Sequence, residues 1–274
     1  MKNKRATICA GGASIRQGMW NTPVKQLPLW DKIKDEFTIG INWDFKFHNS
    51  TVELYGDYEF YIAEKDNLEK LPLVLAPQDG FYGRERERQH NRTEWTNIYH
   101  YSHDIYLLKN RIIEQVDGKQ IVYHEMDGWK KGFYRGILTG SLAIHLAILL
   151  GYTEIYLLGF DGNSINGKTH YYEDEFIGFS KKESGRKKTG IGFDKNGNFN
   201  TSYYQQDINE SFEVFLKSLD KVKIINVSPD SKISLFPKIS YEKFYKRLEN
   251  KQNPISQDNL RHDIKKVYYE NYYS

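Results

Sequence analysis

The sequence holds a single cysteine, Cys9, among its 274 residues. One thiol excludes a framework of intrachain disulfides and is typical of proteins in a reducing compartment. The sequence also lacks an apolar run of about 18 residues, the length that a membrane-spanning helix requires. No apolar segment of the signal-peptide kind stands at the N-terminus. We therefore expect a cytoplasmic protein without a transmembrane segment.

A surplus of charge of either sign is absent as well, because 39 basic and 36 acidic side chains leave a net charge of +3. The chain as a whole therefore lacks the positive field typical of nucleic-acid-binding proteins. The segment 180–192 is a local exception, with five basic residues among glycines and serines. It is too polar to pack, so we expect a loop that is either simply solvated or attracts a nucleotide or a nucleic-acid strand.

Short apolar runs alternate with helical segments along most of the chain. Strands are expected at residues 6–10, 37–42, 52–56, 73–76, 154–160 and 222–227, and helices at 58–68, 139–150, 207–219 and 241–248. This alternation predicts an α/β fold with a doubly wound, mostly parallel, Rossmann-like sheet.

We expect one Rossmann-like, nucleotide-binding transferase domain over residues 1–250, interrupted by an insertion at about 78–131. The insertion contains a predicted hairpin, because Asp117-Gly118 favours a type I′ turn, and it is expected to cap the edge of the sheet. The tail 251–274 either frays or packs on a partner subunit, which would make the protein a homo-oligomer.

The most informative stretch combines a helix, a tight turn and a buried strand that ends in an acid, LTGSLAIHLAILLGYTEIYLLGFDGNS. Thr139 or Ser141 is expected to cap the helix, because a hydroxyl accepts a bond from an unpaired backbone N–H. Gly140 would let a ligand approach those N–H groups. Asp161 and Asn163 follow the strand, at the edge of an open α/β sheet where ligands bind.

The block from Thr139 to Asp161 resembles two protein families. One is the bacterial family 42 sialyltransferases. The other is the MptE-like group (domain of unknown function 115), whose named member is a 6-hydroxymethylpterin diphosphokinase. The block is specific, since it fixes a helix start, a turn and a strand end together. Both resemblances imply a Rossmann-like enzyme that binds a nucleotide.

Further matches to these families imply the walls of a nucleotide pocket. After the first strand, Gly11, Gly12 and Ser14 are similar to the G-x-G-P-S turn of both families, and such a turn offers N–H groups to a phosphate. A turn that serves the topology alone is the alternative. Asn42 matches the asparagine of the sialyltransferase-like C-N-x-F element, which implies a nucleotide contact. The alternative for Asn42 is a turn residue in the left-handed region.

Four more residues are candidates for substrate binding. Ser228 and Ser231 lie in a turn similar to the C/S-P-x-S turn of both families, so they are implied to complete the nucleotide pocket. Asp57 places a carboxylate at the end of the third strand. Arg135 precedes the central helix, and its guanidinium suits an anion such as phosphate.

Three residues are candidates for catalysis: His170, Tyr171 and Asp161. His170 could act as general base on an acceptor hydroxyl, because imidazole titrates near neutrality, or it is an exposed loop residue. Tyr171 is the nearest match to the tyrosine that donates to the leaving phosphate in the sialyltransferase-like family. That family places its base histidine farther on, whereas this chain has no histidine between His170 and His262.

Three functions stay open at this point. The first is a glycosyltransferase that moves a sugar from a nucleotide-sugar donor to an acceptor glycan or another hydroxyl compound, without a metal if the donor is CMP-linked. The second is a diphosphokinase that uses ATP. ATP, or a UDP-linked sugar donor, would bring Mg²⁺, for which Asp57, Asp161 and Glu173 are the available carboxylates. The third is a non-catalytic nucleotide- or glycan-binding module. We assign no residue as a resident metal ligand.

Overall fold

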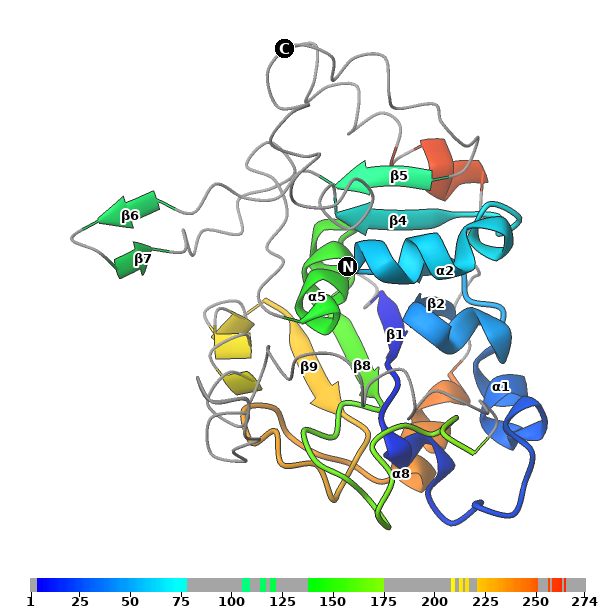
Figure 1. Ribbon diagram of the computed structural model, residues 1–274. Helices are drawn as coiled ribbons and strands as arrows, with labels where there is room; N and C mark the ends of the chain where they lie inside the picture. Colours follow the sequence, from blue (N-terminus) through cyan, green and yellow to red (C-terminus); the bar gives the residue numbers. More distant parts are fainter. Residues whose placement is uncertain are drawn as a thin grey trace, which may run out of the picture.

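The computed structural model describes residues 4–77, 138–174 and 221–250, with shorter pieces at 105–108, 114–116, 119–121, 208–209, 212–213, 215–216, 256, 258–262 and 264. A seven-stranded sheet forms its centre, in the order β5-β4-β3-β2-β1-β8-β9 (Figure 1). The strands are β1 (Arg5–Cys9), β2 (Phe37–Ile41), β3 (Val52–Leu54), β4 (Val74–Pro77), β5 (Ile105–Leu108), β8 (Glu154–Leu158) and β9 (Lys223–Asn226). Every neighbouring pair is parallel, which confirms the predicted fold class.

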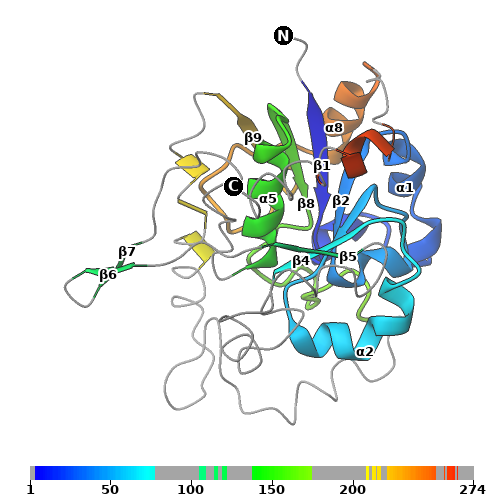
Figure 2. The ribbon, with the colours of Figure 1, turned by 90° about the horizontal axis from the view of Figure 1, so that it is seen from above.

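Helices cover both faces of this sheet (Figure 2). α5 (Thr139–Leu149) packs on one face, whereas α1 (Pro28–Ile33) and α8 (Tyr241–Leu248) pack on the other. Further helical segments are α2 (Tyr58–Leu68) and the 3-10 turns η1 (Ala13–Arg16), η2 (Val24–Gln26) and η3 (Asn42–Lys46). The sheet is therefore doubly wound, as predicted.

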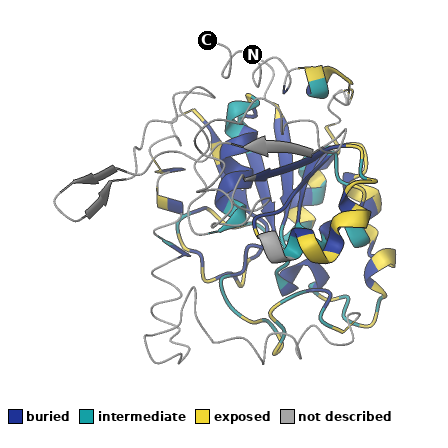
Figure 3. Cartoon of the chain, turned by 45° about the horizontal axis from the view of Figure 1, so that its top comes forward, coloured by how far each residue is buried: buried dark blue, intermediate teal, exposed yellow. Residues whose placement is uncertain are grey.

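The side chains of β1 show how the two cores are divided. Ala6 and Ile8 join the core under α5, and Cys9 points to the core under α1 and α8. Because both faces are covered, β1, β2 and β3 are buried at every position (Figure 3).

α5 is followed by a glycine in the left-handed conformation, but the capping at its first turn differs from the prediction. Leu138 is its N-cap residue, and no side chain caps the helix, so the expected capping by Thr139 or Ser141 is wrong. Thr139 instead lies beside Gly56, at the end of β3, where a Cβ on the glycine would overlap the threonine hydroxyl. At the other end, Gly151 has φ +81°, the left-handed conformation that follows many helices.

Part of the predicted insertion belongs to the main sheet. β5 pairs with β4 and forms an edge strand, which corrects the prediction that 78–131 only caps the sheet. The predicted hairpin is confirmed, because β6 (Glu114–Val116) and β7 (Lys119–Ile121) pair antiparallel. The remaining residues of the insertion lie outside the described part of the chain.

A buried guanidinium joins β1 to distant parts of the chain. Arg5 forms a salt bridge of 2.6 Å with Glu36, and the two side chains are only 4% and 6% exposed. The same guanidinium donates to the carbonyl oxygens of Arg247 (2.6 Å) and Asn250 (3.1 Å), at the end of α8. The central strand is thus held at its start by the end of α8.

The order of the strands fixes where a ligand site is expected. After β1 the chain adds β2, β3, β4 and β5 on one side, and it later returns to place β8 and β9 on the other. The loops that follow β1 and β8 therefore diverge from one point at the carboxyl edge, the position at which open α/β sheets bind ligands. Within the described part of the chain, no helix is long and apolar enough to cross a membrane.

Candidate functional site

Four residues expected around one nucleotide lie at the same edge of the sheet. Gly12 follows β1, Asn42 follows β2, and Asp161 is the third residue after β8. Thr139 begins α5 and touches Gly56, just after β3. Because the strands are parallel, all four lie at the carboxyl edge, as the sequence predicted.

The glycine turn after β1 is fastened to the turn after β8. The Gly12 N–H donates to the carbonyl oxygen of Gly159 at 3.0 Å. A Cβ on Gly12 would lie 2.7 Å from the Gly159 carbonyl carbon and 2.6 Å from the Asp161 carboxylate, so no side chain fits there. Gly159 itself has φ +70°, which favours glycine. The two glycines thus let the ends of β1 and β8 approach each other.

The Asp161 side chain stabilises the junction between the turns that follow β1 and β8. It is 3% exposed, and Oδ2 accepts the Ser14 N–H at 2.8 Å, at the start of η1. Burial raises the pKa of Asp161, while hydrogen bonds from Ser14 and Ser228 lower it and Asp230 raises it further. The carboxylate therefore occupies the place in the glycine turn where a phosphate was expected, and it acts as a positioning group.

The turn after β9 completes the junction. Ser231 Oγ donates to the carbonyl oxygen of Phe160 (2.7 Å) and lies 3.0 Å from that of Asp161. Asn226 Nδ2 also donates to the Phe160 carbonyl, at 2.9 Å. Ser228 is fully buried beside Asp161. These two serines, expected in a nucleotide pocket, hold the end of β8 in place.

The loop after β8 brings His170 next to the glycine turn that follows β1. His170 forms an antiparallel bridge with Gly12, and the next residue, Tyr171, donates its N–H to the Gly11 carbonyl at 3.0 Å. The imidazole stacks on the Tyr172 ring at 5.3 Å and stays one-third exposed. The candidate base is thus fixed at the carboxyl edge and reachable by a ligand.

Thr169 and Glu173 together orient this imidazole, because the Thr169 hydroxyl donates to the Glu173 carboxylate and lies 2.9 Å from His170 Nδ1. The Glu173 carboxylate lies 3.5 Å from His170 Nδ1 and accepts the backbone N–H groups of His170 and Thr169, both at 2.8 Å. Partial burial raises the pKa of Glu173, but hydrogen bonds from Thr169 and His170, together with the nearby imidazole, lower it overall. A carboxylate that stays ionised beside Nδ1 stabilises the imidazolium that a general base becomes.

Tyr171 points away from the edge. Its side chain is 1% exposed, and its hydroxyl donates to Asp44 Oδ1 at 3.1 Å in the core under α1. Burial, followed by the nearby Asp44 carboxylate, raises the pKa of this phenol. In this conformation the hydroxyl is engaged inside the protein, so a contact with a leaving phosphate would require it to release Asp44.

Asn42 combines both roles considered for it. Its φ is +58°, so it occupies the left-handed turn position after β2. Its Oδ1 atom is buried and meets no hydrogen-bond partner among the described residues. A ligand donor at the carboxyl edge could satisfy this oxygen.

The start of α5 offers backbone donors at the same edge. Thr139 and Gly140 are half-buried and occupy its first turn, whose N–H groups have no acceptor within the helix. A Cβ on Gly140 would lie 2.7 Å from the Phe160 ring, so this glycine allows close packing of the helix on the end of β8. Ser141 is fully buried in the helix.

Several predicted residues lie farther out or outside the description. Asp57 is exposed at the N-cap position of α2. Asn163 donates to the neighbouring Ser164 carbonyl at 3.1 Å. Arg135 and the basic segment 180–192 are outside the described residues. Within the described chain, Asp57, Asp161 and Glu173 do not gather into a group that could hold Mg²⁺.

The loop after β8 contains a sequence pattern that its structure contradicts. Residues 162–169, GNSINGKT, match the GxxxxGK[ST] pattern of phosphate-binding P-loops. A P-loop leads into a helix, but here Ile165 pairs with Lys168 around Asn166 (φ +51°) and Gly167 (φ +75°). Lys168 forms an ion pair with Asp174. This segment is a two-residue hairpin turn, so the match to a P-loop is coincidental.

The sequence reasoning missed a buried polar cluster on the face under α1. It comprises the buried residues Cys9, Asp44, His48 and Glu53 and the half-buried Ser50, which come from β1, η3, the loop after η3 and β3. Burial, followed by the Asp44 carboxylate, raises the pKa of both Cys9 and Glu53, and the Phe45 N–H lowers that of Glu53. A glutamate in mid-strand was the available signal, because β3 is otherwise apolar.

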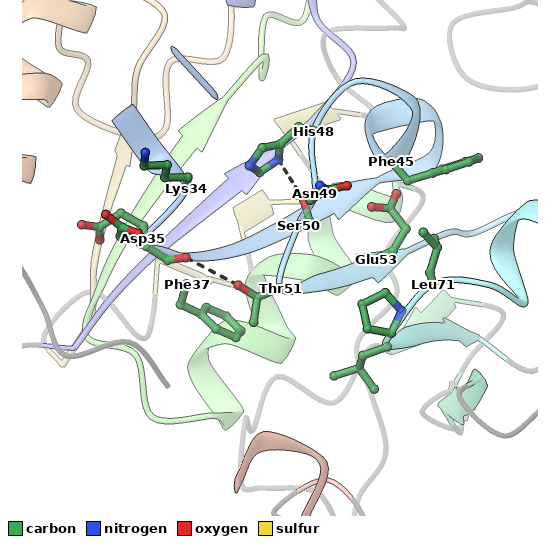
Figure 4. A pocket seen from close by; sticks show the side chains of 13 residues that line it. Lys34, Asp35, Phe37, Phe45, His48, Asn49, Ser50, Thr51, Glu53 and Leu71 are labelled. Atoms are coloured by element: carbon green, nitrogen blue, oxygen red, sulfur yellow. Dashed lines mark hydrogen bonds between the residues drawn. The ribbon is translucent and has the colours of Figure 1, made fainter. Parts of the chain in front are cut away.

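A cavity of about 540 Å³ reaches this cluster from outside (Figure 4). The segments that precede β2, β3 and β4 line it, so it opens away from the carboxyl edge. His48, Ser50 and Glu53 belong both to its wall and to the buried cluster.

Comparisons with known proteins give a weak likeness. No family model matches the chain, and no curated protein sequence does. Among solved structures, the sialyltransferase CstII from Campylobacter jejuni with the substrate analogue CMP-3FNeuAc is 17% identical, with a TM-score of 0.44 and 86% of each chain covered. CST-II with a trisaccharide acceptor and CMP is 16% identical, with a TM-score of 0.44 and 85% of each chain covered. The monofunctional alpha-2,3-sialyltransferase Cst-I from Campylobacter jejuni is 16% identical, with a TM-score of 0.46 and coverage of 98% of this chain and 95% of that one. With TM-scores below 0.5, this likeness assigns no activity.

Proposed function

We propose that the chain is a nucleotide-dependent transferase of the glycosyltransferase type, in which His170 is the general base. The observation that carries the proposal is the Glu173–His170 pair, fixed by a backbone bridge to the glycine turn at the topological switch point. An imidazole that is one-third exposed, with a carboxylate 3.5 Å from one nitrogen, can take a proton from an acceptor hydroxyl at the other nitrogen.

The reaction would run in one displacement. His170 removes the proton of the acceptor hydroxyl, whose oxygen forms a bond to the anomeric carbon of the donor sugar. The bond from that carbon to the nucleotide phosphate breaks, and the phosphate leaves with the electron pair. Glu173 stabilises the resulting imidazolium.

The nucleotide would lie between the base and the start of α5. Thr139 and Gly140 present N–H groups that suit a phosphate, and Asn42 presents an amide for a base or ribose edge. Gly11 and Gly56 follow β1 and β3, two strand spacings apart, or about 10 Å. A nucleotide's phosphate and sugar can span this distance. The resemblance of 139–161 to sialyltransferases makes CMP the first nucleotide to test.

Thermal shift with CMP, UDP, GDP and ATP, each with and without Mg²⁺, tests the nucleotide class. We expect CMP to stabilise the protein without metal, by about 2.7 kcal/mol at a concentration 100-fold above Kd. Stabilisation by ATP that requires Mg²⁺ would indicate a diphosphokinase instead. If none of the nucleotides binds, a nucleotide-dependent transferase is refuted.

Replacement of the imidazole tests the catalytic assignment. His170→Ala should lower the release of CMP from a CMP-linked sugar donor in the presence of glycan acceptors by about 10²–10⁴-fold. Its thermal shift with CMP should stay, because the base does not hold the nucleotide. His262→Ala, at an exposed position, is the matched control. Unchanged turnover in His170→Ala would remove the role of this residue.

A further inference from the structure

The buried cluster under α1 is built around a glycine in the middle of the sheet. The register pairs Cys9 of β1 with Gly40 of β2, and Gly40 with Glu53 of β3. Paired residues of parallel strands point to the same face, so the thiol and the carboxylate flank the space that Gly40 leaves empty. That space lies between two side chains that both bind metal ions in proteins.

Three oxygen atoms enter the space above Gly40. A Cβ on this glycine would lie 2.5 Å from Ser50 Oγ and 2.6 Å from Asp44 Oδ2, with Glu53 Oε2 closer still. Asp44 is 1% exposed and Glu53 3% exposed, so two carboxylates converge away from water. Without a positive charge between them, such a pair is costly to bury.

The cluster contains no side chain that supplies this positive charge permanently. His48 Nδ1 lies 3.2 Å from Asp44 Oδ2 and 3.1 Å from Ser50 Oγ, and its ring stacks on Trp30 at 5.0 Å. His48 Nε2 and both carboxylate oxygens of Glu53 are buried and meet no hydrogen-bond partner at bonding distance among the described residues. The unpaired carboxylate of Glu53 therefore enters this space, and His48 carries a further unused ligand atom.

We propose that Cys9, Asp44 and His48, with Glu53 as the fourth ligand, bind a zinc-type divalent transition-metal ion. One ligand atom from each of the first three residues lies within 4.8 Å of the other two, and all three residues are buried. In a tetrahedral zinc site, neighbouring ligand atoms are about 3.5 Å apart, so shifts of about 1 Å bring these three ligands onto one ion, whereas Glu53 lies outside this group and has to move farther to join them. A thiolate with an imidazole and carboxylates suits Zn²⁺ rather than Mg²⁺ or Ca²⁺.

The surroundings fit a closed, structural metal site. Tyr171 donates to the other oxygen of Asp44, an outer contact of the kind that orients a ligating carboxylate. Four protein ligands leave no open position for a substrate, as in structural zinc sites. The cavity lined by His48 and Glu53 provides a path for the ion (Figure 4). The site lies in the core under α1, and this proposal does not depend on the transferase proposal.

Cobalt titration of the full-length protein tests this inference. After chelator treatment and dialysis, Co²⁺ should produce a near-ultraviolet thiolate-to-metal charge-transfer band that saturates at one ion per chain, and Zn²⁺ should displace it. Because Cys9 is the single cysteine, this band can come only from Cys9. Elemental analysis of the protein purified without chelator should likewise find about one Zn²⁺ per chain.

Variants distinguish residues that ligate the metal ion from residues that do not. Cys9→Ser should abolish the band, and Tyr171→Phe should lower Co²⁺ affinity about 10–100-fold while the band remains. His262→Asn should titrate as the wild type does. Circular dichroism checks that each variant is folded. Folded wild-type protein that gives no thiolate band would overturn the proposal and leave Asp44 and Glu53 sharing a proton instead. This result would leave the thermal-shift test of nucleotide binding unaffected, so the two proposals can fail separately.

Discussion

Gly12→Ala isolates the junction between β1 and β8, because only one methyl group is added. The backbone at Gly12 has φ −63°, which alanine adopts without strain, so any effect must come from contacts. The new Cβ would lie 2.6 Å from the Asp161 carboxylate and 2.7 Å from the Gly159 carbonyl carbon, and the carbonyl oxygen is closer still. Two of these atoms are backbone and cannot rotate away.

The cost follows from two contributions. Overpacking of this kind costs about 1–3 kcal/mol. Separation of the two turns also weakens the hydrogen bond from Gly12 N–H to Gly159, worth about 0.5–1.5 kcal/mol. We therefore expect Gly12→Ala to lower the free energy of unfolding by about 2–4 kcal/mol, which corresponds to a fall in Tm of about 5–15 °C.

Urea unfolding of Gly12→Ala and Gly18→Ala provides the comparison. Gly18 has φ +74° and nothing within 4 Å of its Cβ position, so alanine there suffers from backbone strain alone. That strain costs about 1 kcal/mol. If Gly12→Ala costs no more than Gly18→Ala, the turns do not pack as closely as described, and the reasoning fails.

Three further outcomes are expected. Arg5→Met should lower the free energy of unfolding, measured in urea, by about 3–5 kcal/mol, because it leaves Glu36 buried and unpaired. Lys223→Met, at a surface ion pair, should change that free energy by no more than about 0.5 kcal/mol, and equal costs for the two variants would refute this. Burial raises the pKa of Tyr156 to about 12, so the unfolded state loses this proton first and the free energy of unfolding should fall between pH 10 and 12. Tyr156→Phe should reduce that fall by about 1–2 kcal/mol, and identical pH profiles of the variant and the wild type would contradict this expectation. Glu173→Gln should lower turnover about tenfold or more at unchanged CMP binding, as judged by kcat and thermal shift, and full activity would exclude its role.

The layered fold could be predicted because its signals are local. The apolar runs that became β1 and β8 are short and bounded by glycine or polar residues, which favours buried parallel strands. β5 was missed for the opposite reason: Ile105–Leu108 is a short apolar run in a polar insertion, and only its pairing with β4 makes it a strand of the sheet.

The polar details depend on register, which the sequence does not contain. Asp161 ends a strand whether its carboxylate faces a ligand or a neighbouring turn, and only the contact with Ser14 distinguishes the two. Cys9, Gly40 and Glu53 are far apart in the chain and become neighbours when three strands align. His170 was identified from its residue type, but its orienting partner, Glu173, emerged from the geometry of the turn.

The place of β1 between β2 and β8 has a consequence for the newly made chain. β2 is synthesised soon after β1, but β8 begins only at Glu154, and the carbonyl groups that bind Arg5 come after residue 246. At about 5–20 residues per second, one side of the first strand stays open for roughly 10–30 s on the ribosome. The N-terminal half must therefore wait, with an unpaired edge, for contacts that close late, and we expect slow folding that benefits from a chaperone.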